Sequence, residues 1–223
     1  MTRGRTTGYQ RVNIDPLMNC GQHERHCSAT ELTSMSKTYR GDHRLGEIEI
    51  IEEIKVFENR FATLYNDKVV FPSGATGEYL RFWWNAPYGV LIIASTAQHQ
   101  LLLIRNFRHE DRAWQWEIPK GFGEPELTPE ACAAKELHEE TGFAASSWHK
   151  LHTLDTHGTP THVFRATLAA EQLATPETSE AIAQAKLCNV DECRQLIADG
   201  QVHDPITLYA ITLLKLEQAQ QQA

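Results

Sequence analysis

Residues 119–143 read PKGFGEPELTPEACAAKELHEETGF, and the second half of this stretch has the features of a helix with two defined ends. Thr128 is a favourable N-cap residue, and Pro129 suits the first helical position, where no N–H group is needed. Gly142 can end the helix in a left-handed conformation. The sequence therefore predicts a helix of about three turns between Thr128 and Gly142.

The C-terminal end of this predicted helix carries three glutamates. Glu136 and Glu140 are i,i+4 neighbours and Glu139 comes between them in the sequence, so their carboxylates are expected to project from one face. Like-charge pairs cost a few tenths of a kcal/mol each, and an acid in the last turn opposes the helix dipole by roughly 0.3–1 kcal/mol. A hard divalent cation would reverse the sign of this energy, so the cluster predicts a metal site.

Composition restricts the class of protein. A chain of 223 residues suits one domain of about 150–180 residues with an appendage. A content of 41% hydrophobic and 22% charged residues is typical of a soluble globular protein, and five scattered cysteines fit reduced thiols. The net charge of −8 disfavours nucleic-acid binding, and no apolar run suits a signal peptide or a membrane span. We therefore expect a cytoplasmic protein that binds neither nucleic acid nor membranes.

Residues 1–45 are rich in Thr, Ser, Arg, Gly and His and lack hydrophobic periodicity, which predicts an extension that is disordered or partly ordered against the body. Four residues of metal-ligand type stand there as C-x2-H-x2-H-C: Cys20, His23, His26 and Cys27. One short loop rarely wraps a tetrahedral ion, and no second half-site follows at zinc-finger spacing. We therefore interpret this cluster as part of an exposed polar tail, with its role left open.

From Gly46 onward the sequence has the alternation typical of strands. Three runs within residues 46–86 predict a small antiparallel N-terminal sheet, with a turn at Asn66-Asp67 inside the second run. Residues 87–223 are the predicted main domain, with strands at residues 89–95, 100–108, 114–119, 147–154 and 161–168 and further helices at residues 190–200 and 204–218. Strands and helices mixed without strict βαβ alternation indicate an α+β fold.

The spacing of glycine and glutamate around the predicted helix is G-x14-E-x2-E-E-x-G, formed by Gly121, Glu136, Glu139, Glu140 and Gly142. It resembles the Nudix box, G-x5-E-x7-R-E-U-x-E-E-x-G-U, in which U is a bulky apolar residue. Leu137 and Phe143 occupy two U positions. The resemblance is specific because the strand, loop and helix around these residues have the order that the box requires.

Two positions depart from the box. Leu127 stands where the box has its first Glu, and Lys135 stands where it has Arg. The planar fork of Arg suits the orientation of a carboxylate better than the single ammonium of Lys135 does, although Lys135 and Glu139 are still i,i+4 partners. The missing Glu would weaken a metal position or the anchoring of the loop. The departures predict reduced activity rather than none.

The resemblance extends over residues 46–215. The N-terminal sheet and the stretches R-N-F-R-H, W-E-I-P-K-G and G-Q-V-H-D-P-I-T-L look like the ADP-ribose pyrophosphatase branch of the Nudix hydrolases. This resemblance implies an α/β/α sandwich with a mixed sheet between helices, in which residues 87–223 are the catalytic domain. It also implies a homodimer whose active sites borrow residues from the partner.

The implied activity is hydrolysis of the pyrophosphate bond in a nucleoside diphosphate linked to another moiety, as in ADP-ribose or an ADP-sugar. Mg²⁺, or alternatively Mn²⁺, would assist the attack of water on one phosphorus. The products would be a nucleoside monophosphate and a phosphorylated second product, such as ribose 5-phosphate.

The resemblance also assigns roles to residues of this sequence. The implied substrate-binding residues are Arg108, Glu117 and Lys120. The implied metal ligands are Glu136, Glu139, Glu140 and the backbone carbonyl of Lys120. The implied catalytic residues are Glu139, Glu140 and a loop acid, which is either Glu177 or Glu180.

Three other interpretations stay open at this point. The P-K-G sequence before the helix weakly favours a dinucleoside polyphosphate hydrolase. Leu127 and Lys135 are also compatible with a non-catalytic regulatory module that binds a nucleotide and has a degenerate Nudix box. The three glutamates are also compatible with an acidic helix face that is simply solvated.

Four tryptophans could either stack on a base or belong to the core: Trp83, Trp84, Trp114 and Trp116.

Overall fold

A computed structural model describes residues 39–172 and 181–221. The cluster formed by Cys20, His23, His26 and Cys27 lies outside these residues, as do the two candidate loop acids, Glu177 and Glu180. No helix in the described part of the chain is long and apolar enough to cross a membrane.

A four-stranded antiparallel sheet comes first, after a short 3-10 helix (His43–Leu45). It consists of β1 (Glu49–Glu52), β2 (Lys55–Glu58), β3 (Ala62–Val70) and β4 (Thr76–Trp84). β1 and β2 pair with different parts of β3, and β4 pairs with β3 along its whole length. The antiparallel N-terminal sheet predicted from the sequence is therefore present, with one strand more than the three expected runs.

The turn predicted at Asn66-Asp67 is wrong, because β3 runs through both residues. Asp67 is buried, and its carboxylate accepts a hydrogen bond from Arg81 Nε at 2.8 Å. Arg81 lies on the neighbouring strand β4, where it also pairs with Glu53 at 3.1 Å. This cross-strand pairing offsets the low strand propensity of Asp, which a local reading of the sequence does not detect.

The main domain is built on a seven-stranded mixed sheet. Its strands are β5 (Gly89–Ser95), β6 (Leu101–Arg108), β7 (Ala113–Glu117), β8 (Lys120–Phe122), β9 (Phe143–Thr156), β10 (Thr159–Gln172) and β11 (Ile182–Cys188). The sheet order is β11-β6-β5-β10-β9, with β5 and β10 parallel. The helices are α1 (Pro129–Thr141), α2 (Val190–Ala198) and α3 (Pro205–Gln221). The predicted α+β class is confirmed, whereas β8 and β11 were not predicted.

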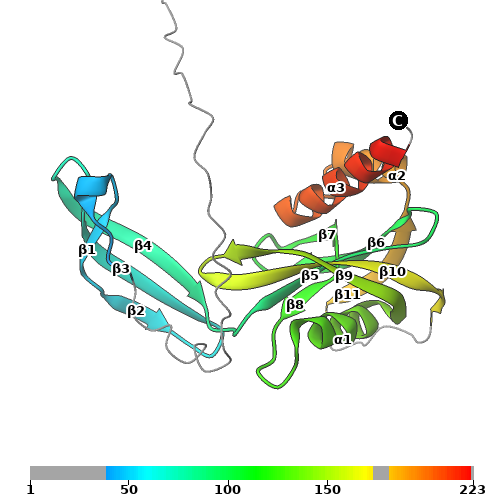
Figure 1. Cartoon of the computed structure of the whole chain (residues 1–223), viewed down its shortest axis with the longest axis horizontal. Coiled ribbons are helices and arrows are strands. Elements are labelled where there is room, and N and C mark those ends of the chain that lie inside the picture. Colours follow the sequence, from blue (N-terminus) through cyan, green and yellow to red (C-terminus); the bar gives the residue numbers. More distant parts are fainter. Residues whose placement is uncertain (1–38, 173–180, 222–223) are drawn as a thin grey trace, which may run out of the picture. The chain divides into compact units, whose positions relative to one another are not determined.

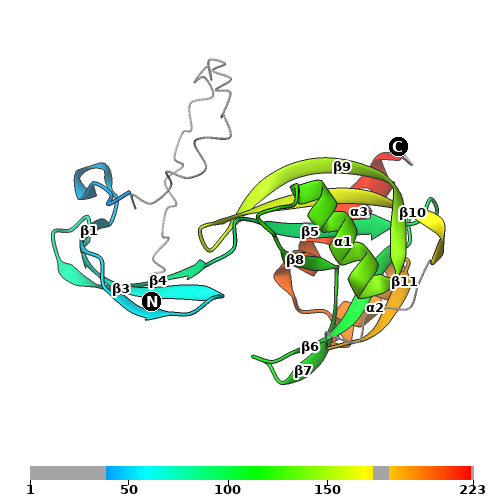
Figure 2. The same ribbon diagram turned by 90° about the horizontal axis from the view of Figure 1, so that it is seen from below.

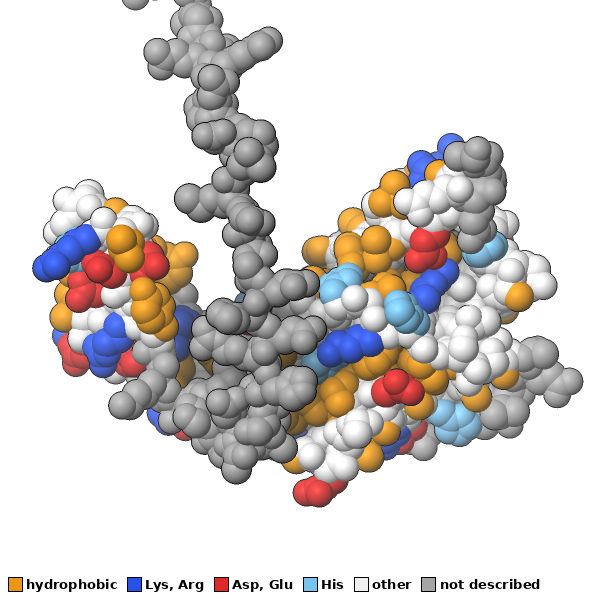
Figure 3. Space-filling model, in the orientation of Figure 1, with side chains coloured by type: hydrophobic (Ala, Val, Ile, Leu, Met, Phe, Trp, Pro, Cys, Tyr) orange, Lys and Arg blue, Asp and Glu red, His pale blue; other side chains and the backbone are white. Residues whose placement is uncertain are grey.

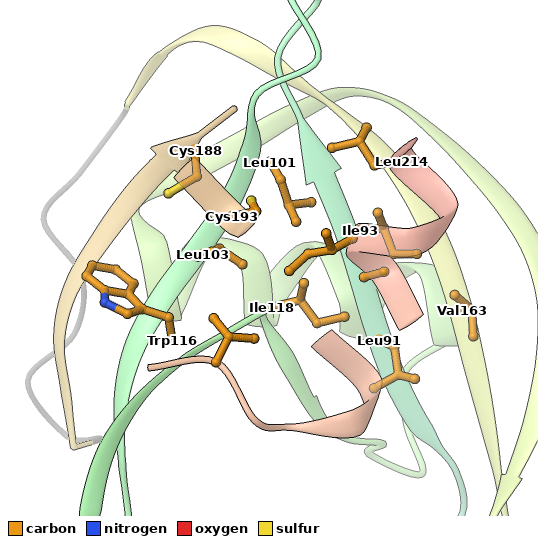
Figure 4. Close-up of a cluster of buried hydrophobic side chains, with 13 residues drawn as sticks. Leu91, Ile93, Leu101, Leu103, Trp116, Ile118, Val163, Cys188, Cys193 and Leu214 are labelled. Atoms are coloured by element: carbon orange, nitrogen blue, oxygen red, sulfur yellow. The ribbon is translucent and has the colours of Figure 1, made fainter. Parts of the chain in front are cut away.

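Helices cover both faces of this sheet (Figures 1 and 2). Leu91 and Ile93 of β5 pack in a core cluster with Cys193 of α2 and Leu214 of α3, and Figure 4 shows this cluster. The alternate residues Val90 and Ile92 belong to a second cluster, with Cys132, Ala133 and Leu137 of α1. β5 is therefore buried on both faces, which explains why its sequence is a continuous apolar run.

The sheet opens between β5 and β6. These strands pair at Ser95 and Leu101, beyond which β7 pairs with β6 and β8 pairs with β5. The chain of β7 and β8 therefore fills a gap between two strands of the sheet. Side chains from all four strands come together at this opening.

Candidate active site

A cavity of about 810 Å³ lies at the opening of the sheet. β5 to β8 contribute to its lining, together with α1, the β9–β10 hairpin and the start of α3. Its charged lining residues are Arg108, Glu110, Asp111, Lys120, Glu136, Glu140 and Asp204.

Helix α1 brings two of the predicted glutamates into this cavity, because Glu136 and Glu140 both line it. The helix has the predicted ends. The Thr128 hydroxyl accepts a hydrogen bond from the Ala131 N–H at 3.2 Å, and Gly142 is left-handed with φ of 71°. The sequence signals at both ends of the helix are therefore confirmed, and they fix the register of the two glutamates.

Glu136 lies against Gly121 of β8. A Cβ atom added to Gly121 would stand 2.1 Å from Glu136 Cδ and 2.2 Å from Glu136 Oε1. Only a residue without a side chain leaves room for the carboxylate at this place. The glycine of the G-x14-E spacing is thus needed for the approach of Glu136 to the strand.

Glu140 is buried, with 4% of its surface exposed, and its Oε2 accepts a hydrogen bond from the Lys120 backbone N–H at 3.2 Å. Glu139 differs, because it is absent from the cavity lining and its carboxylate lies 3.7 Å from Lys135 Nζ. At about 100° per residue Glu139 and Glu140 diverge by a quarter of a turn. The structure thus brings Glu136 and Glu140 together and leaves Glu139 beside Lys135.

Glu117 is fully buried and is held by three side chains. Arg108 approaches it with two nitrogens, with Nε at 3.1 Å from Oε2. Asn106 Nδ2 donates to Oε1 at 2.8 Å, and Lys120 Nζ lies 3.0 Å from Oε2. A buried carboxylate needs such compensation. Glu117 therefore orients Arg108 and Lys120, the two cations of the cavity lining.

Asp204 is a site residue that was not predicted as one; it is the first residue of the helix predicted at residues 204–218. Its Oδ2 lies 2.9 Å from Lys120 Nζ and accepts hydrogen bonds from Thr207 N and Oγ1 at 3.1 and 2.7 Å. Burial by itself raises the pKa of Asp204, but Lys120 and Thr207 outweigh it, so the pKa lies below its ordinary value. Asp204 therefore stays ionised and ties the start of α3 to Lys120.

The structure gives a physical account of the two departures from the Nudix box. Leu127 is half-buried and packs against the core cluster under α1. Its carbonyl accepts a hydrogen bond from the Tyr88 hydroxyl at 2.6 Å, and the Glu124 carbonyl lies 3.0 Å from the same hydroxyl. The loop before α1 is thus anchored to Tyr88, the residue before β5, without a glutamate at position 127.

Lys135 forms ion pairs with Glu124 of this loop and with Glu139 of its own helix. The hydrogen bond to Glu124 raises the pKa of Lys135, so the ammonium stays charged. Lys135 thereby links the loop to the helix and also lies 3.7 Å from the Glu139 carboxylate.

One of the four tryptophans lines the cavity, and it is Trp84. Its ring centroid lies 5.0 Å from that of Phe122, which also lines the cavity. Trp116 is in the core, and Trp114 packs on Phe107. Trp84 and Phe122 therefore form the aromatic wall of the cavity, where a base could stack.

The cavity lining is strongly acidic. Five carboxylates, those of Glu110, Asp111, Glu136, Glu140 and Asp204, face two cations, Arg108 and Lys120. Both cations are already engaged by acids. A polyphosphate would therefore meet a net negative charge unless cations accompanied it.

The donor set at this place suits Mg²⁺. Glu136 and Glu140 supply hard carboxylate oxygens, and Mg²⁺ is commonly held by one or two carboxylates with waters and substrate phosphates. Within residues 39–172 and 181–221, no three His, Cys, Asp or Glu side chains gather as a complete metal cage. Two carboxylates therefore suit an ion whose remaining ligands are waters and substrate oxygens.

Comparison with known proteins gives consistent similarities. Residues 86–209 match the NUDIX domain. The chain is 28% identical over 186 residues to an ADP-ribose pyrophosphatase of Bacillus subtilis (strain 168), covering 78% of this chain and 96% of the relative. It is 26% identical over 172 residues to the CMP-5'-(N-acetyl-N-hydroxy-3-aminopropyl)phosphonate hydrolase of Streptomyces rubellomurinus (strain ATCC 31215), covering 75% and 82%.

A solved structure described as an ADP compounds hydrolase has a similar fold. Its TM-score is 0.62 at 19% sequence identity, and the match covers 79% of this chain and 96% of the other. At this identity the similarity concerns the fold, and it agrees with the mixed sheet between helices described above.

Proposed function

The chain belongs to the NUDIX domain family and is a Nudix-type pyrophosphohydrolase. On this premise we propose that it hydrolyses ADP-ribose or a related ADP-sugar with the help of Mg²⁺. The observation that carries this proposal is the acidic cavity in which Glu136 and Glu140 stand beside Arg108 and Lys120. Such a lining suits a substrate that arrives with a divalent ion.

The substrate class is supported by the size and walls of the cavity. A volume of about 810 Å³ is in the range of sites for molecules of nucleotide size. Trp84 and Phe122 offer an aromatic wall for a base. The Bacillus subtilis relative is named for ADP-ribose and the Streptomyces relative for a CMP derivative, so the base and the second moiety must both be varied in the test.

The residues of the cavity have separable roles in this proposal. Glu136 and Glu140 would hold the metal, which supplies charge neutralisation for the pyrophosphate and a lowered pKa for the attacking water. Arg108 and Lys120 are oriented by Glu117 and Asp204, so their remaining N–H groups can donate to phosphate oxygens. Trp84 would contact the base.

Four predicted features complete the proposal. Glu139 is proposed to orient the metal ligands through Lys135 or to ligate the ion itself. The loop acid, Glu177 or Glu180, is proposed as a further ligand or base and lies outside the described residues. The domain division at residues 46–86 and 87–223 and the cytoplasmic location remain predictions.

We also propose a homodimer formed through the N-terminal sheet. Several large apolar side chains of this sheet are more than half exposed: Ile51, Val56, Phe57, Tyr79 and Leu80. In the space-filling view, hydrophobic side chains of this sheet lie at the surface among charged ones (Figure 3). A surface of this kind marks an interaction site, and a second copy fits the resemblance to dimeric enzymes. Sedimentation at one chain mass, 25.3 kDa, would contradict the dimer.

A panel of substrates tests the proposed reaction. Release of phosphorylated products is measured with Mg²⁺, with Mn²⁺ and with EDTA from ADP-ribose, ADP- and GDP-sugars, NADH and diadenosine polyphosphates. We expect AMP and ribose 5-phosphate from ADP-ribose, and no product with EDTA. Faster cleavage of a diadenosine polyphosphate would move the assignment to that substrate class, and full activity in EDTA would refute the metal requirement.

The Gly121→Ala variant tests the approach of Glu136 to β8. The added methyl group would displace the Glu136 carboxylate, because its nearest atoms are those of that carboxylate. A displacement of about 1 Å in a catalytic site can lower the rate by up to about 100-fold, so we expect kcat/KM to fall by about 10- to 100-fold. The backbone of Gly121 has no left-handed conformation, so the unfolding midpoint should change little. Unchanged kcat/KM would show that Glu136 is not used at this position.

A further inference from the structure

The Gln115 side chain lines the cavity and has a buried polar atom without a hydrogen-bond partner. Gln115 lies on β7 with 5% of its surface exposed, and it lines the cavity. Its Oε1 is buried without a hydrogen-bond partner, and it is the single side-chain nitrogen or oxygen of this kind in residues 39–172 and 181–221. Buried polar atoms are normally paired, so this oxygen needs an explanation.

The position of Gln115 restricts what its partner can be. It stands opposite Asn106 in the β6–β7 ladder, two residues before Glu117, and therefore on the same face as both. Asn106 Nδ2 is committed to Glu117. Gln115 lines the space that the substrate would occupy, and a rotation of its side-chain amide would turn the acceptor toward a bound donor.

The chemistry of the substrate restricts the partner further. Oε1 of a glutamine accepts hydrogen bonds and cannot donate them. An ionised pyrophosphate also offers only acceptors, so it cannot satisfy Gln115. Apart from a water molecule, the partner would be a donor on one of the two other parts of the substrate, either a hydroxyl of a sugar or the amino group of a base.

The topology of the sheet favours the sugar. Trp84 and Phe122 form the aromatic wall beside β5 and β10, since Phe122 pairs with Gly89 of β5 and the Trp84 carbonyl accepts a hydrogen bond from Thr159 of β10. Gln115 belongs to the other side of the opening, where β7 pairs with β6. A base stacked on Trp84 would leave the second moiety on the side of Gln115.

We propose that Gln115 is a specificity-determining residue whose Oε1 accepts a hydrogen bond from a neutral donor of the substrate, in first place a hydroxyl of the sugar beyond the pyrophosphate. This inference rests on the proposed function, because it assumes that a nucleoside diphosphate derivative binds in the cavity. A site that pairs with a substrate hydroxyl discriminates strongly against an analogue that lacks it.

The test compares two substitutions on two classes of analogue. Gln115→Met removes the acceptor at nearly constant shape, and Gln184→Met is the matched control on an exposed position of β11. The parent substrate is the compound that the wild type hydrolyses fastest in the panel. One analogue lacks the hydroxyls of the second moiety, such as the methyl ester of ADP for ADP-ribose. The other replaces the base amino group by a carbonyl, such as inosine diphosphate ribose.

The expected result is a loss of kcat/KM for the parent of about tenfold or more in Gln115→Met, with little change for the analogue without sugar hydroxyls. If Gln115→Met instead lowers kcat/KM for every substrate except the inosine analogue, the donor is the amino group of the base. That result would still support the role of Gln115. Gln184→Met should behave as wild type. The unfolding midpoint of Gln115→Met should not fall, because no protein hydrogen bond is removed from Oε1; a structural role would lower it.

Two results would overturn the inference in distinguishable ways. In the first, the wild type cleaves the panel and Gln115→Met discriminates between the parent and the two analogues as the wild type does. Gln115 would then contact only water, and the proposed function would stand. A wild type that cleaves no member of the panel would overturn the proposed function and the inference with it.

Discussion

Glu140→Gln is expected to lower kcat by at least about 100-fold while the protein keeps its fold. Glu140 is 4% exposed and lies in the cavity with Glu136, so its charge is well placed for a divalent ion. The amide of glutamine is a weaker ligand for such an ion than a carboxylate is. Its carbonyl can still accept the hydrogen bond from the Lys120 N–H. Activity should therefore fall without a large loss of packing.

The measurement is kcat with saturating Mg²⁺ on the best substrate, together with thermal unfolding with and without Mg²⁺. Binding of the ion to the folded state should raise the unfolding midpoint of the wild type and not that of the variant. In EDTA the variant should unfold at the same or a higher temperature, because one acid is removed from the last turn of α1. Glu130→Gln, exposed in the first turn of the same helix, is the control. Normal turnover in Glu140→Gln would remove Glu140 from the site.

The parts of this site that could be predicted from the sequence are those with local causes. Thr128, Pro129 and Gly142 determine α1 through backbone groups within a few residues, so the helix was found with nearly its observed ends. The i,i+4 spacing then brings Glu136 and Glu140 to one cavity. Glu139 was assigned to the same face, but helical geometry turns it toward Lys135, which is also i,i+4 to it.

The parts that were missed depend on contacts between distant residues. Asp204 begins the helix predicted at residues 204–218, but its ion pair with Lys120 bridges 84 positions of the sequence. Gln115 has no local signal, because its importance comes from a cavity built by several strands. The continuity of β3 through Asp67 likewise depends on Arg81 of the next strand. Periodicity and turn propensity depend on residues that are close in the sequence, so they cannot predict these contacts between distant residues.

Glu117→Gln is expected to have the second large effect, which is on stability. The substitution leaves Arg108 and Lys120 beside a neutral amide in a place where the carboxylate is fully buried. Removing one member of a buried ion pair typically costs about 3–5 kcal/mol. The two cations keep 32% and 20% of their side-chain surface in solvent, so we expect a smaller loss of roughly 2–3 kcal/mol. The unfolding midpoint should fall by roughly 4–12 °C.

The matched control is Glu52→Gln, which removes a carboxylate paired with Lys68 on the N-terminal sheet. Both of those side chains are more than half exposed, so solvent already screens the pair and the midpoint should not change measurably. Comparing the calorimetric unfolding midpoints of the two variants separates the effect of losing a buried carboxylate from the effect of losing any ion pair. An equal midpoint for Glu117→Gln and wild type would mean that Arg108 and Lys120 are held by other contacts. The variant could also show a lower midpoint together with a raised KM, because Arg108 would no longer be oriented toward the cavity. That result would assign both the stability and the substrate-binding role to one buried carboxylate.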